Sequence, residues 1–224
     1  MKVLLLDVGS TFIKYTVYET SSKNELFSGS VLFPQPLIND GVHYEVSEEE
    51  IRKIIYQIFD TASEKECKSA FICVQMHGYL LRRNSTFGNY ISWRDNRGDI
   101  SNYRLTNVDF SESGTAIKKN SPLASLCTYE ESVLAESEFF TLGSYISFLP
   151  TGKNITHKTD AYASGFFNAQ TLEKYDVFDN LVLPSVLGNV EIIGKYCDID
   201  IYAPMGDHQI SFLGSNAEEK THIS

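Results

Sequence analysis

Short apolar runs alternate with polar turns over the first third of the chain. The run at residues 2–7 ends in a carboxylate, a Gly-Ser turn follows, and residues 12–18 are rich in β-branched and aromatic side chains. This pattern predicts two strands joined by a tight turn. Residues 26–33 are predicted to add a third strand to the same meander, which Pro34 and Pro36 then stop.

A helix and a buried strand are predicted next. Ser47 lies three residues before Glu50, as in a capping box, and isoleucine and phenylalanine then recur at helical spacing to about Ala62. Residues 70–74 form a continuous apolar run, which predicts a buried strand that ends at residues 75–78. The order β-β-β-α-β over this part of the chain indicates an α/β protein.

The middle of the chain carries weaker patterns. A short strand is predicted at residues 90–93, and residues 99–151 mix helical spacing with helix breakers. Within that stretch Thr128 and Glu131 form a second possible capping box, ahead of an apolar series that reaches Phe139.

The last third is predicted to contain a helical turn and two strands. The helical turn covers residues 159–165, and the strands cover residues 190–193 and 199–203. The second of these strands leads into residues 204–207, which include Asp207. The chain has no internal repeat and no low-complexity tract.

Composition narrows the classes of partner. The 224 residues carry 19 Lys and Arg against 29 Asp and Glu, a formal net charge of −10, and no Lys/Arg run is longer than a pair. Such a chain repels phosphate backbones and anionic lipid, so nucleic acid and membrane surfaces are not expected as partners. Hydrophobic residues make up 42% of the chain, which is enough for a sizeable core and too many for a disordered protein.

The N-terminus and the cysteines indicate a cytoplasmic protein. The first apolar run is shorter than the hydrophobic region of a signal peptide and far shorter than a membrane span. The four cysteines include no CxxC pair and have no His at metal-ligand spacing. Reduced, mostly buried thiols are therefore expected, rather than a zinc site or a disulfide framework.

Residues 7–11, Asp-Val-Gly-Ser-Thr, place a carboxylate at a strand end, followed by a glycine and two hydroxyls. A carboxylate can hold Mg²⁺ through water, while hydroxyl, amide and ammonium groups meet a phosphoryl group. These residue types suit a nucleotide phosphate site with Asp7 toward the metal and with Gly9, Ser10, Thr11 and Lys14 toward phosphate. An ordinary hairpin turn explains the same residues without a ligand.

Asp207 is predicted at a junction between a strand and a helix. A carboxylate in that place can accept a proton from a substrate hydroxyl that attacks phosphorus. It can equally serve as the N-cap of the helix. Asp7 and Asp207 lie 200 residues apart in the sequence, so only the fold can bring them together.

Two further groups follow strand ends. His77 ends the predicted buried strand, where α/β sheets usually meet their ligands, although a single His is more often structural. Trp93, Asp95 and Arg97 cluster after another strand, and a local Asp-Arg pair beside a partly buried Trp explains them equally well.

Five stretches, in this order, resemble the FGGY carbohydrate kinases, a family of the actin-like ATPase superfamily. They are residues 6–11 with Lys14, 75–78 (Gln-Met-His-Gly), 93–97 (Trp-Arg-Asp-Asn-Arg), 159–168 and 206–209 (Gly-Asp-His-Gln). The resemblance implies an α/β, ribonuclease H-like domain with a mixed sheet flanked by helices. It also favours the phosphate-site and base interpretations over the turn and the cap.

The resemblance assigns roles to these residues in an ATP-dependent sugar kinase. Asp207 would accept the hydroxyl proton, Asp7 would organise Mg²⁺, and Ser10, Thr11 and Lys14 would face the γ-phosphoryl group of ATP. The implied sugar contacts are Gln75, Met76 and His77, with Trp93, Asp95 and Arg97 in second rank. The Gln-Met-His-Gly strand is similar to that of xylulokinases and sedoheptulokinases. The Trp-x-Asp-x-Arg element, the Gly-Asp-x-Gln loop and the run 163–170 look most like those of sedoheptulokinases, so a sedoheptulose-like ketose is the expected substrate.

The resemblance also implies that the chain is an N-terminal half. FGGY kinases have two ribonuclease H-like domains with ATP between them, whereas residues 1–214 match only the sugar-binding and catalytic domain, and residues 215–224 resemble the start of a second. Activity is therefore expected to need a C-terminal kinase domain, in cis or in trans. The alternatives are a non-catalytic sugar-binding or scaffold remnant, and an actin-like ATPase of another family, which the Gln-Met-His-Gly strand disfavours.

Overall fold

A mixed sheet forms the base of the molecule. The computed structural model describes residues 1–106, 108–113 and 115–215. The strands of this sheet are β1 (Lys2–Val8), β2 (Phe12–Glu19), β3 (Asn24–Leu32), β6 (Ser69–Val74), β13 (Ile192–Tyr196), β14 (Ile199–Tyr202) and β15 (Met205–Gly206). Their spatial order is β13-β14-β6-β1-β2-β3, with β15 also paired to β6. The predicted meander is confirmed, and β1, β14 and β15 run parallel to β6.

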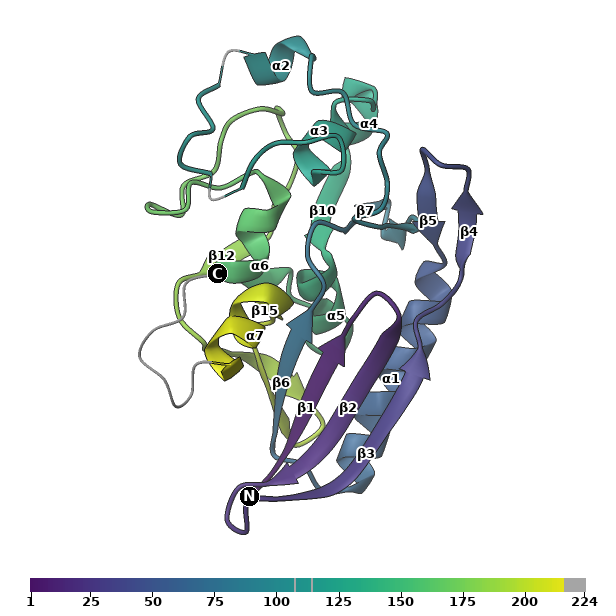
Figure 1. Cartoon of the computed structure of the whole chain (residues 1–224), viewed down its shortest axis with the longest axis vertical. Coiled ribbons are helices and arrows are strands. Elements are labelled where there is room, and N and C mark those ends of the chain that lie inside the picture. Colours follow the sequence, from purple (N-terminus) through teal and green to yellow (C-terminus); the bar gives the residue numbers. More distant parts are fainter. Residues whose placement is uncertain (107, 114, 216–224) are drawn as a thin grey trace.

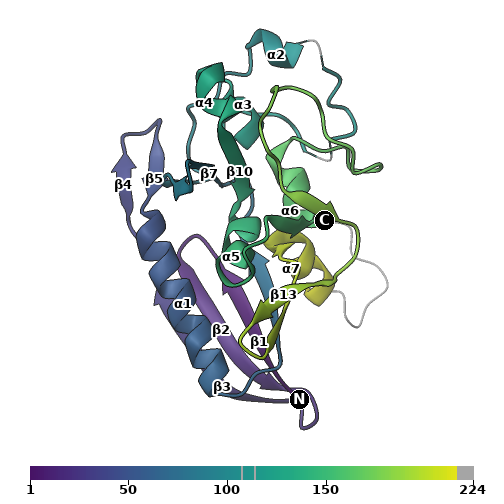
Figure 2. The same cartoon turned by 180° about the vertical axis from the view of Figure 1, so that it is seen from behind.

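Two helices cover one face of this sheet. α1 (Glu48–Glu64) and α5 (Leu142–Thr151) lie behind it in Figure 1 and in front of it in Figure 2. α1 begins as predicted, because the Ser47 hydroxyl oxygen accepts a hydrogen bond from the Glu50 amide at 3.3 Å. The apolar stripe of α1 is buried in one core with alternate side chains of β1 and β6. α7 (Asp207–Ser215) lies on the opposite face, over β6 (Figure 1).

A second, smaller sheet extends the molecule beyond the first. Its strands are β4 (Pro36–Asn39), β5 (Tyr44–Val46), β7 (Tyr79–Arg83), β8 (Thr86–Phe87), β9 (Tyr90–Ile91) and β10 (Ser137–Thr141). The nearby short helices are α2 (Tyr103–Thr106), α3 (Pro122–Leu126) and α4 (Glu131–Ala135). A separate apolar cluster, centred on Tyr79, Phe139 and Phe166, holds this region together.

The predicted helical turn near residue 160 is confirmed. α6 (Lys158–Ala161) continues into a 3₁₀ turn (Tyr162–Ser164), directly after β11 (Ile155–His157), which pairs with β12 (Ser185–Leu187). No helix in the described ranges is long and apolar enough to cross a membrane. The predicted start of a second domain, residues 215–224, lies outside the described residues except for Ser215, the last residue of α7.

The meander ends at the prolines as predicted, since β3 ends at Leu32, and β4, which begins at Pro36, belongs to the second sheet. Two other expectations from the sequence are wrong in detail. The second capping box does not form: α4 follows Glu130 without a side-chain cap, and the Thr128 hydroxyl donates to the Ser125 carbonyl at 2.7 Å. Phe139 lies in β10 rather than in a helix.

Candidate active site

The fold brings the two distant carboxylates to one edge of the larger sheet. Asp7 of β1 and Met205 of β15 both stand in register with Cys73 of β6, and Asp207 follows two residues after Met205. Neighbouring strands are about 4.8 Å apart, which places β1 and β15 about 10 Å apart across β6. The negative charge of Asp7 accordingly helps to raise the pKa of Asp207.

The predicted phosphate turn is tied to the end of β6. The Gly9 amide donates to the Phe12 carbonyl at 3.0 Å and closes the turn between β1 and β2. Gln75 donates twice to this segment, from its backbone amide to Val8 at 2.9 Å and from its side chain to Gly9 at 3.4 Å. Lys14 stands directly across from Asp7 on β2, so the two opposite charges share one face of the sheet.

The end of β6 is shaped for close packing. His77 has φ +64°, a left-handed conformation that non-glycine residues rarely adopt and that is most common at functional sites. Gly78 cannot be replaced without movement, because a Cβ there would lie 2.0 Å from the Tyr90 hydroxyl. The Gln75 side-chain oxygen is buried and has no hydrogen-bond partner among the described residues, so it is free to accept one from a ligand.

Burial and neighbouring groups set the protonation of His77. Desolvation lowers its pKa, a hydrogen bond to the Ala163 carbonyl and the charge of Asp207 oppose that shift, and Lys118 adds to it. The net pKa lies below the ordinary value, so His77 is neutral at pH 7. A neutral imidazole carries a proton on one ring nitrogen and keeps the other as an acceptor.

Asp207 is the first residue of α7. Burial raises its pKa most, hydrogen bonds from the backbone amides of Asp207 and His208 lower it, and Asp7 raises it; the net shift is upward. The amide contacts are typical of a cap, and the raised pKa makes the carboxylate a better proton acceptor than an exposed one. The structure is therefore compatible with both interpretations of Asp207.

A pocket of about 460 Å³ unites four of the five stretches singled out in the sequence. It is lined by Ser10, Gln75, Met76, His77, Trp93, Asp207, His208 and Ser211. Ser211 did not emerge from the sequence, although its spacing of four residues from Asp207 places both on one side of α7. Asp7 and Lys14 line an adjoining, more apolar pocket of about 380 Å³ with Cys73, Met205 and Ile210.

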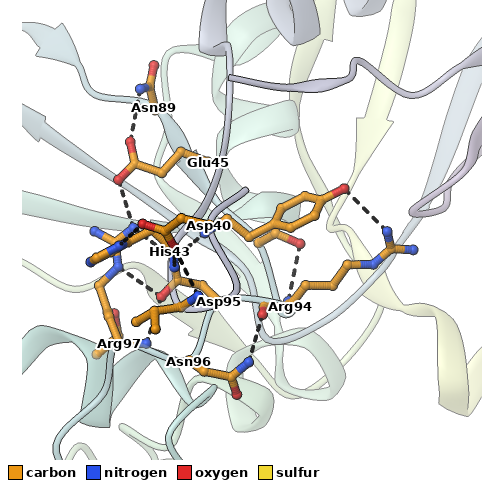
Figure 3. Close-up of polar contacts among 12 residues, drawn as sticks. Asp40, His43, Glu45, Asn89, Arg94, Asp95, Asn96 and Arg97 are labelled. Atoms are coloured by element: carbon orange, nitrogen blue, oxygen red, sulfur yellow. Dashed lines mark hydrogen bonds and ion pairs between the residues drawn. The ribbon is translucent and has the colours of Figure 1, made fainter. Parts of the chain in front are cut away.

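Asp95 and Arg97 do not line this pocket. Figure 3 shows their ion pair: the Arg97 guanidinium donates to Asp95 at 2.7 and 2.8 Å and to Glu45 at 2.7 Å. Asp95 also accepts the Tyr44 amide at 2.7 Å, which fastens the β4–β5 hairpin to the loop that carries Trp93. Of the second-rank candidates, only Trp93 meets the pocket.

The candidate metal position is supplied by few carboxylates. No group of three or more His, Cys, Asp or Glu side chains in the described ranges is arranged to hold a metal ion. Mg²⁺ in nucleotide-dependent enzymes is usually bound through one or two carboxylates together with substrate phosphates, so Asp7 and Asp207 fit that pattern.

Solved structures with the same fold are carbohydrate kinases. No protein-family model and no curated protein matches the sequence. A xylulose kinase from Lactobacillus acidophilus superposes with a TM-score of 0.84 at 21% identity, over 96% of this chain and 50% of that one. A gluconate kinase from Lactobacillus acidophilus gives 0.83 at 21%, over 97% and 50%. Plasmodium falciparum glycerol kinase with ADP gives 0.77 at 17%, over 95% and 50%.

These likenesses establish the fold. The chain has the mixed α/β architecture of sugar kinases of the actin-like ATPase fold, as the resemblance in its sequence implied. It spans about half the length of the kinases that it matches.

Proposed function

We propose that this chain is the N-terminal half of an ATP-dependent sugar kinase, which transfers the γ-phosphoryl group of ATP to a hydroxyl of a ketose. One observation carries the proposal: Ser10 of the phosphate turn, His77 of the β6 end and Asp207 line a single pocket, although they lie up to 197 residues apart in the chain. A phosphate-facing turn, a polar sugar wall and a base are the parts that phosphoryl transfer to an alcohol requires.

Each part has a role in that reaction. Asp207, with its raised pKa, accepts the proton of the attacking hydroxyl. Ser10, Thr11 and the Gly9 backbone face the transferring phosphoryl group, and Lys14 adds a positive charge beside it. Mg²⁺, held through water by Asp7, would neutralise charge on the ATP phosphates.

The pocket walls support a polyhydroxylated substrate. Gln75 offers an unpartnered acceptor, His77 offers a neutral ring nitrogen, and Met76 and Trp93 offer apolar contact to a carbon chain. We assign a sedoheptulose-like ketose as first choice, on the resemblance of residues 75–78 and 163–170 to sedoheptulokinases. Xylulose, gluconate and glycerol, which name the matched kinases, are the competitors to test.

The proposal includes a second kinase half as partner. No residue of α7 is buried, and Leu213 is 65% exposed. On the same face of the sheet Leu5 is 42% exposed beside Phe71, which stacks on Tyr202. Exposed apolar side chains that gather on one face are typical of interaction surfaces, so they support a covering domain on this face.

A second candidate function is sugar binding without catalysis. It is favoured by the coverage of only half of each matched kinase, which leaves this chain with one wall of an ATP site. Calorimetry of the 224-residue chain, followed by a phosphorylation assay with a C-terminal kinase domain added, separates the two. A kinase half is expected to bind Mg-ATP weakly or not at all and to phosphorylate a ketose once the complementary domain is added.

The outcomes of that experiment divide cleanly. Low-micromolar binding of Mg-ATP by the monomeric chain would contradict the need for a second half. Binding of a ketose, with no phosphorylation after a C-terminal kinase domain is supplied, would favour the sugar-binding function.

A further inference from the structure

A line of hydrogen bonds joins Gly188, the residue directly after β12, to β11, α6 and β15. The Gly206 amide donates to the Thr159 hydroxyl oxygen at 3.0 Å. That oxygen lies 3.0 Å from Nδ1 of His157, and Nε2 of His157 lies 3.2 Å from the Gly188 carbonyl. None of these groups lines the pocket, yet the line ends on the residue immediately before Asp207.

Donor and acceptor chemistry gives the line one direction. The Gly188 carbonyl can only accept, so His157 carries its proton on Nε2 and donates to it. The unprotonated Nδ1 of the neutral ring then accepts from the Thr159 hydroxyl, whose oxygen in turn accepts from the Gly206 amide. This arrangement requires a neutral imidazole, and His157 is 6% exposed, with a pKa that burial lowers below the ordinary value.

The segment from His157 to Thr159 makes further contacts with the chain at β15. The His157 amide donates to the Pro204 carbonyl at 3.1 Å, two residues before Gly206. A Cβ at Gly206 would lie 2.9 Å from the Thr159 carbonyl and 2.4 Å from the Met76 sulfur. Gly206 is thus packed tightly between α6 and the end of β6. These contacts fix the direction of the backbone at the point where it continues from β15 into Asp207.

We infer that Thr159, oriented by neutral His157, is a positioning residue for Asp207. It acts through the Gly206 amide and touches neither sugar nor phosphate. The description of Asp207 as a base rests on the proposed function, whereas the positioning itself does not. The titratable groups around Asp207 are Asp7, Cys73, His77, Tyr90, Asp160 and His208.

The test compares hydroxyl removal with hydroxyl retention in the 224-residue chain. Thr159→Val keeps the side-chain shape and removes the acceptor, whereas Thr159→Ser keeps the hydroxyl. Ser147→Ala is the matched control, because it removes a fully buried hydroxyl that bonds to the Ser144 and Ile155 carbonyls, away from β15. NMR follows exchange of the Gly206 amide and the pH titration of the Asp207 carboxyl carbon.

Thr159→Val is expected to speed exchange of the Gly206 amide by about tenfold, the equivalent of one lost hydrogen bond. It is also expected to return the pKa of Asp207 toward its ordinary value, because a released carboxylate moves toward water. Thr159→Ser and Ser147→Ala should leave both signals as in the parent chain. If Thr159→Val lowers only the melting temperature, as Ser147→Ala does, Thr159 is merely structural and the inference fails.

A second pair of variants covers the case in which Thr159→Val does not fold. His157→Asn supplies an amide oxygen in place of Nδ1, and His157→Leu supplies no acceptor. Only His157→Leu should disturb the Asp207 titration, and equal effects of both variants would overturn the role of His157. In the enzyme completed with its second half, Thr159→Val is expected to lower kcat by about ten- to a hundredfold while KM for the sugar stays within about twofold. If the variants alter the NMR signals as expected but the completed parent protein has no kinase activity, Thr159 still positions Asp207 and the proposed function is wrong.

Discussion

Two aspartates that follow strands, Asp95 and Asp207, differ in how much of their hydrogen-bonding capacity is used inside the protein. Asp95 is 2% exposed, and it accepts the Tyr44 amide, the Arg97 amide and two guanidinium N–H groups at 2.7–3.0 Å. Asp207 is held only by amides at the start of its own helix within the described part of the chain, and it faces a 460 Å³ pocket. A carboxylate with free acceptor capacity can take a proton from a ligand, whereas a saturated one can only hold other parts of the protein in place.

Asp95 still contributes to the pocket indirectly, although it does not line it. Asp95 and Arg97 bind the β4–β5 hairpin through Tyr44 and Glu45, and Figure 3 shows the contact between Arg97 and Glu45. The guanidinium carbon of the intervening Arg94 lies 5.4 Å from the ring centroid of Tyr44 and 5.3 Å from that of Trp93. The position of Trp93 at the pocket is therefore supported by an ion pair whose residues do not line the pocket. The motif Trp-Arg-Asp-Asn-Arg therefore contains residues of two kinds. Trp93 lines the pocket, whereas Asp95 and Arg97 hold the surrounding segments together.

Removal of the proposed base is expected to have the largest effect. In the enzyme completed with its second half, Asp207→Asn is expected to lower turnover by about 10²–10⁴-fold, because the amide keeps size and reach but cannot accept the proton. Sugar affinity, measured by calorimetry, should stay within a few-fold of the parent. Asparagine is also a good N-cap, so the melting temperature should hold. A variant that keeps more than half of the turnover, with chemistry limiting the rate, would make Asp207 a cap like any other.

Asp95 should show the opposite balance, with a large effect on stability and little on chemistry. Asp95→Ala leaves the Arg97 guanidinium, whose side chain is 13% exposed, with Glu45 as its one remaining carboxylate partner. Loss of one partner of a buried pair costs about 3–5 kcal/mol in the free energy of unfolding, which urea denaturation can measure. Asp40→Ala is the control in the same hairpin, because Asp40 is exposed and, in the ranges that the structure describes, bonds only within its own turn, to the His43 ring and to the Val42 and His43 amides, so its loss should cost clearly less than that of Asp95. Equal effects of the two substitutions would refute the structural role given to Asp95.

A third carboxylate, Asp160, lies between these cases and provides a pH test. It is fully buried, the Thr141 and Thr156 hydroxyls donate to it, and burial together with the charge of Asp207 raises its pKa from 3.8 to about 6. Folded protein then binds a proton more tightly than unfolded protein between those two values. The free energy of unfolding should fall by up to about 3 kcal/mol as pH rises from about 4 to above 6.

The control for that pH test is Asp160→Asn, which cannot ionise. The free energy of unfolding, measured at a series of pH values, should decrease between about pH 4 and above pH 6 in the parent chain. The part of this decrease that Asp160 causes should be absent from the variant. In Asp207→Asn, the decrease in the free energy of unfolding that Asp160 causes should occur at lower pH, because this substitution removes the charge that helps to raise the pKa of Asp160. Identical pH dependence in the parent and in Asp160→Asn would show that Asp160 is neutralised some other way.

Local signals explain which parts of the fold could be predicted from the sequence. The meander, the helix capped by Ser47 and the strand at residues 69–74 each follow from periodicity or capping within a few residues. The β4–β5 hairpin could not be predicted, because its pairing with β9 depends on residues 44 positions away, and a proline at its start reads as a terminator. α4 is likewise determined by packing rather than by its weak capping pattern.

The site divides in the same way. The residue types at Asp7, His77 and Asp207 suggested chemistry, but their convergence depends on the parallel pairing of β1 and β15 with β6. The roles of Asp95 and Arg97 could not be separated from that of Trp93 in the sequence, since only the hydrogen bonds distinguish them. The positioning line through Thr159 and His157 has no signature at all, because it joins segments 47 residues apart.

The smallest expected effect concerns His77, a neutral side chain that, like Asp207, keeps part of its hydrogen-bonding capacity free for a ligand. Its neutral imidazole lines the pocket and keeps one ring nitrogen as an acceptor, so it should contribute one hydrogen bond to a sugar hydroxyl. Such a bond contributes about 0.5–1.5 kcal/mol, so His77→Ala should raise the dissociation constant of the preferred ketose by several-fold to about tenfold. The affinity for ATP should change less. Calorimetry with sedoheptulose, xylulose, ribulose and glycerol identifies the preferred ligand.

The left-handed backbone at His77 supplies the control that separates contact from strain. His77→Gly removes the same side chain but suits φ +64°, so it should lose the same sugar affinity as His77→Ala while its melting temperature stays higher. If instead His77→Gly restores binding that His77→Ala has lost, the loss came from backbone distortion and not from a missing hydrogen bond. If both variants weaken every ligand equally, or if glycerol is the preferred substrate, His77 does not read the sugar and belongs with Asp95 among the groups that only hold the pocket in shape.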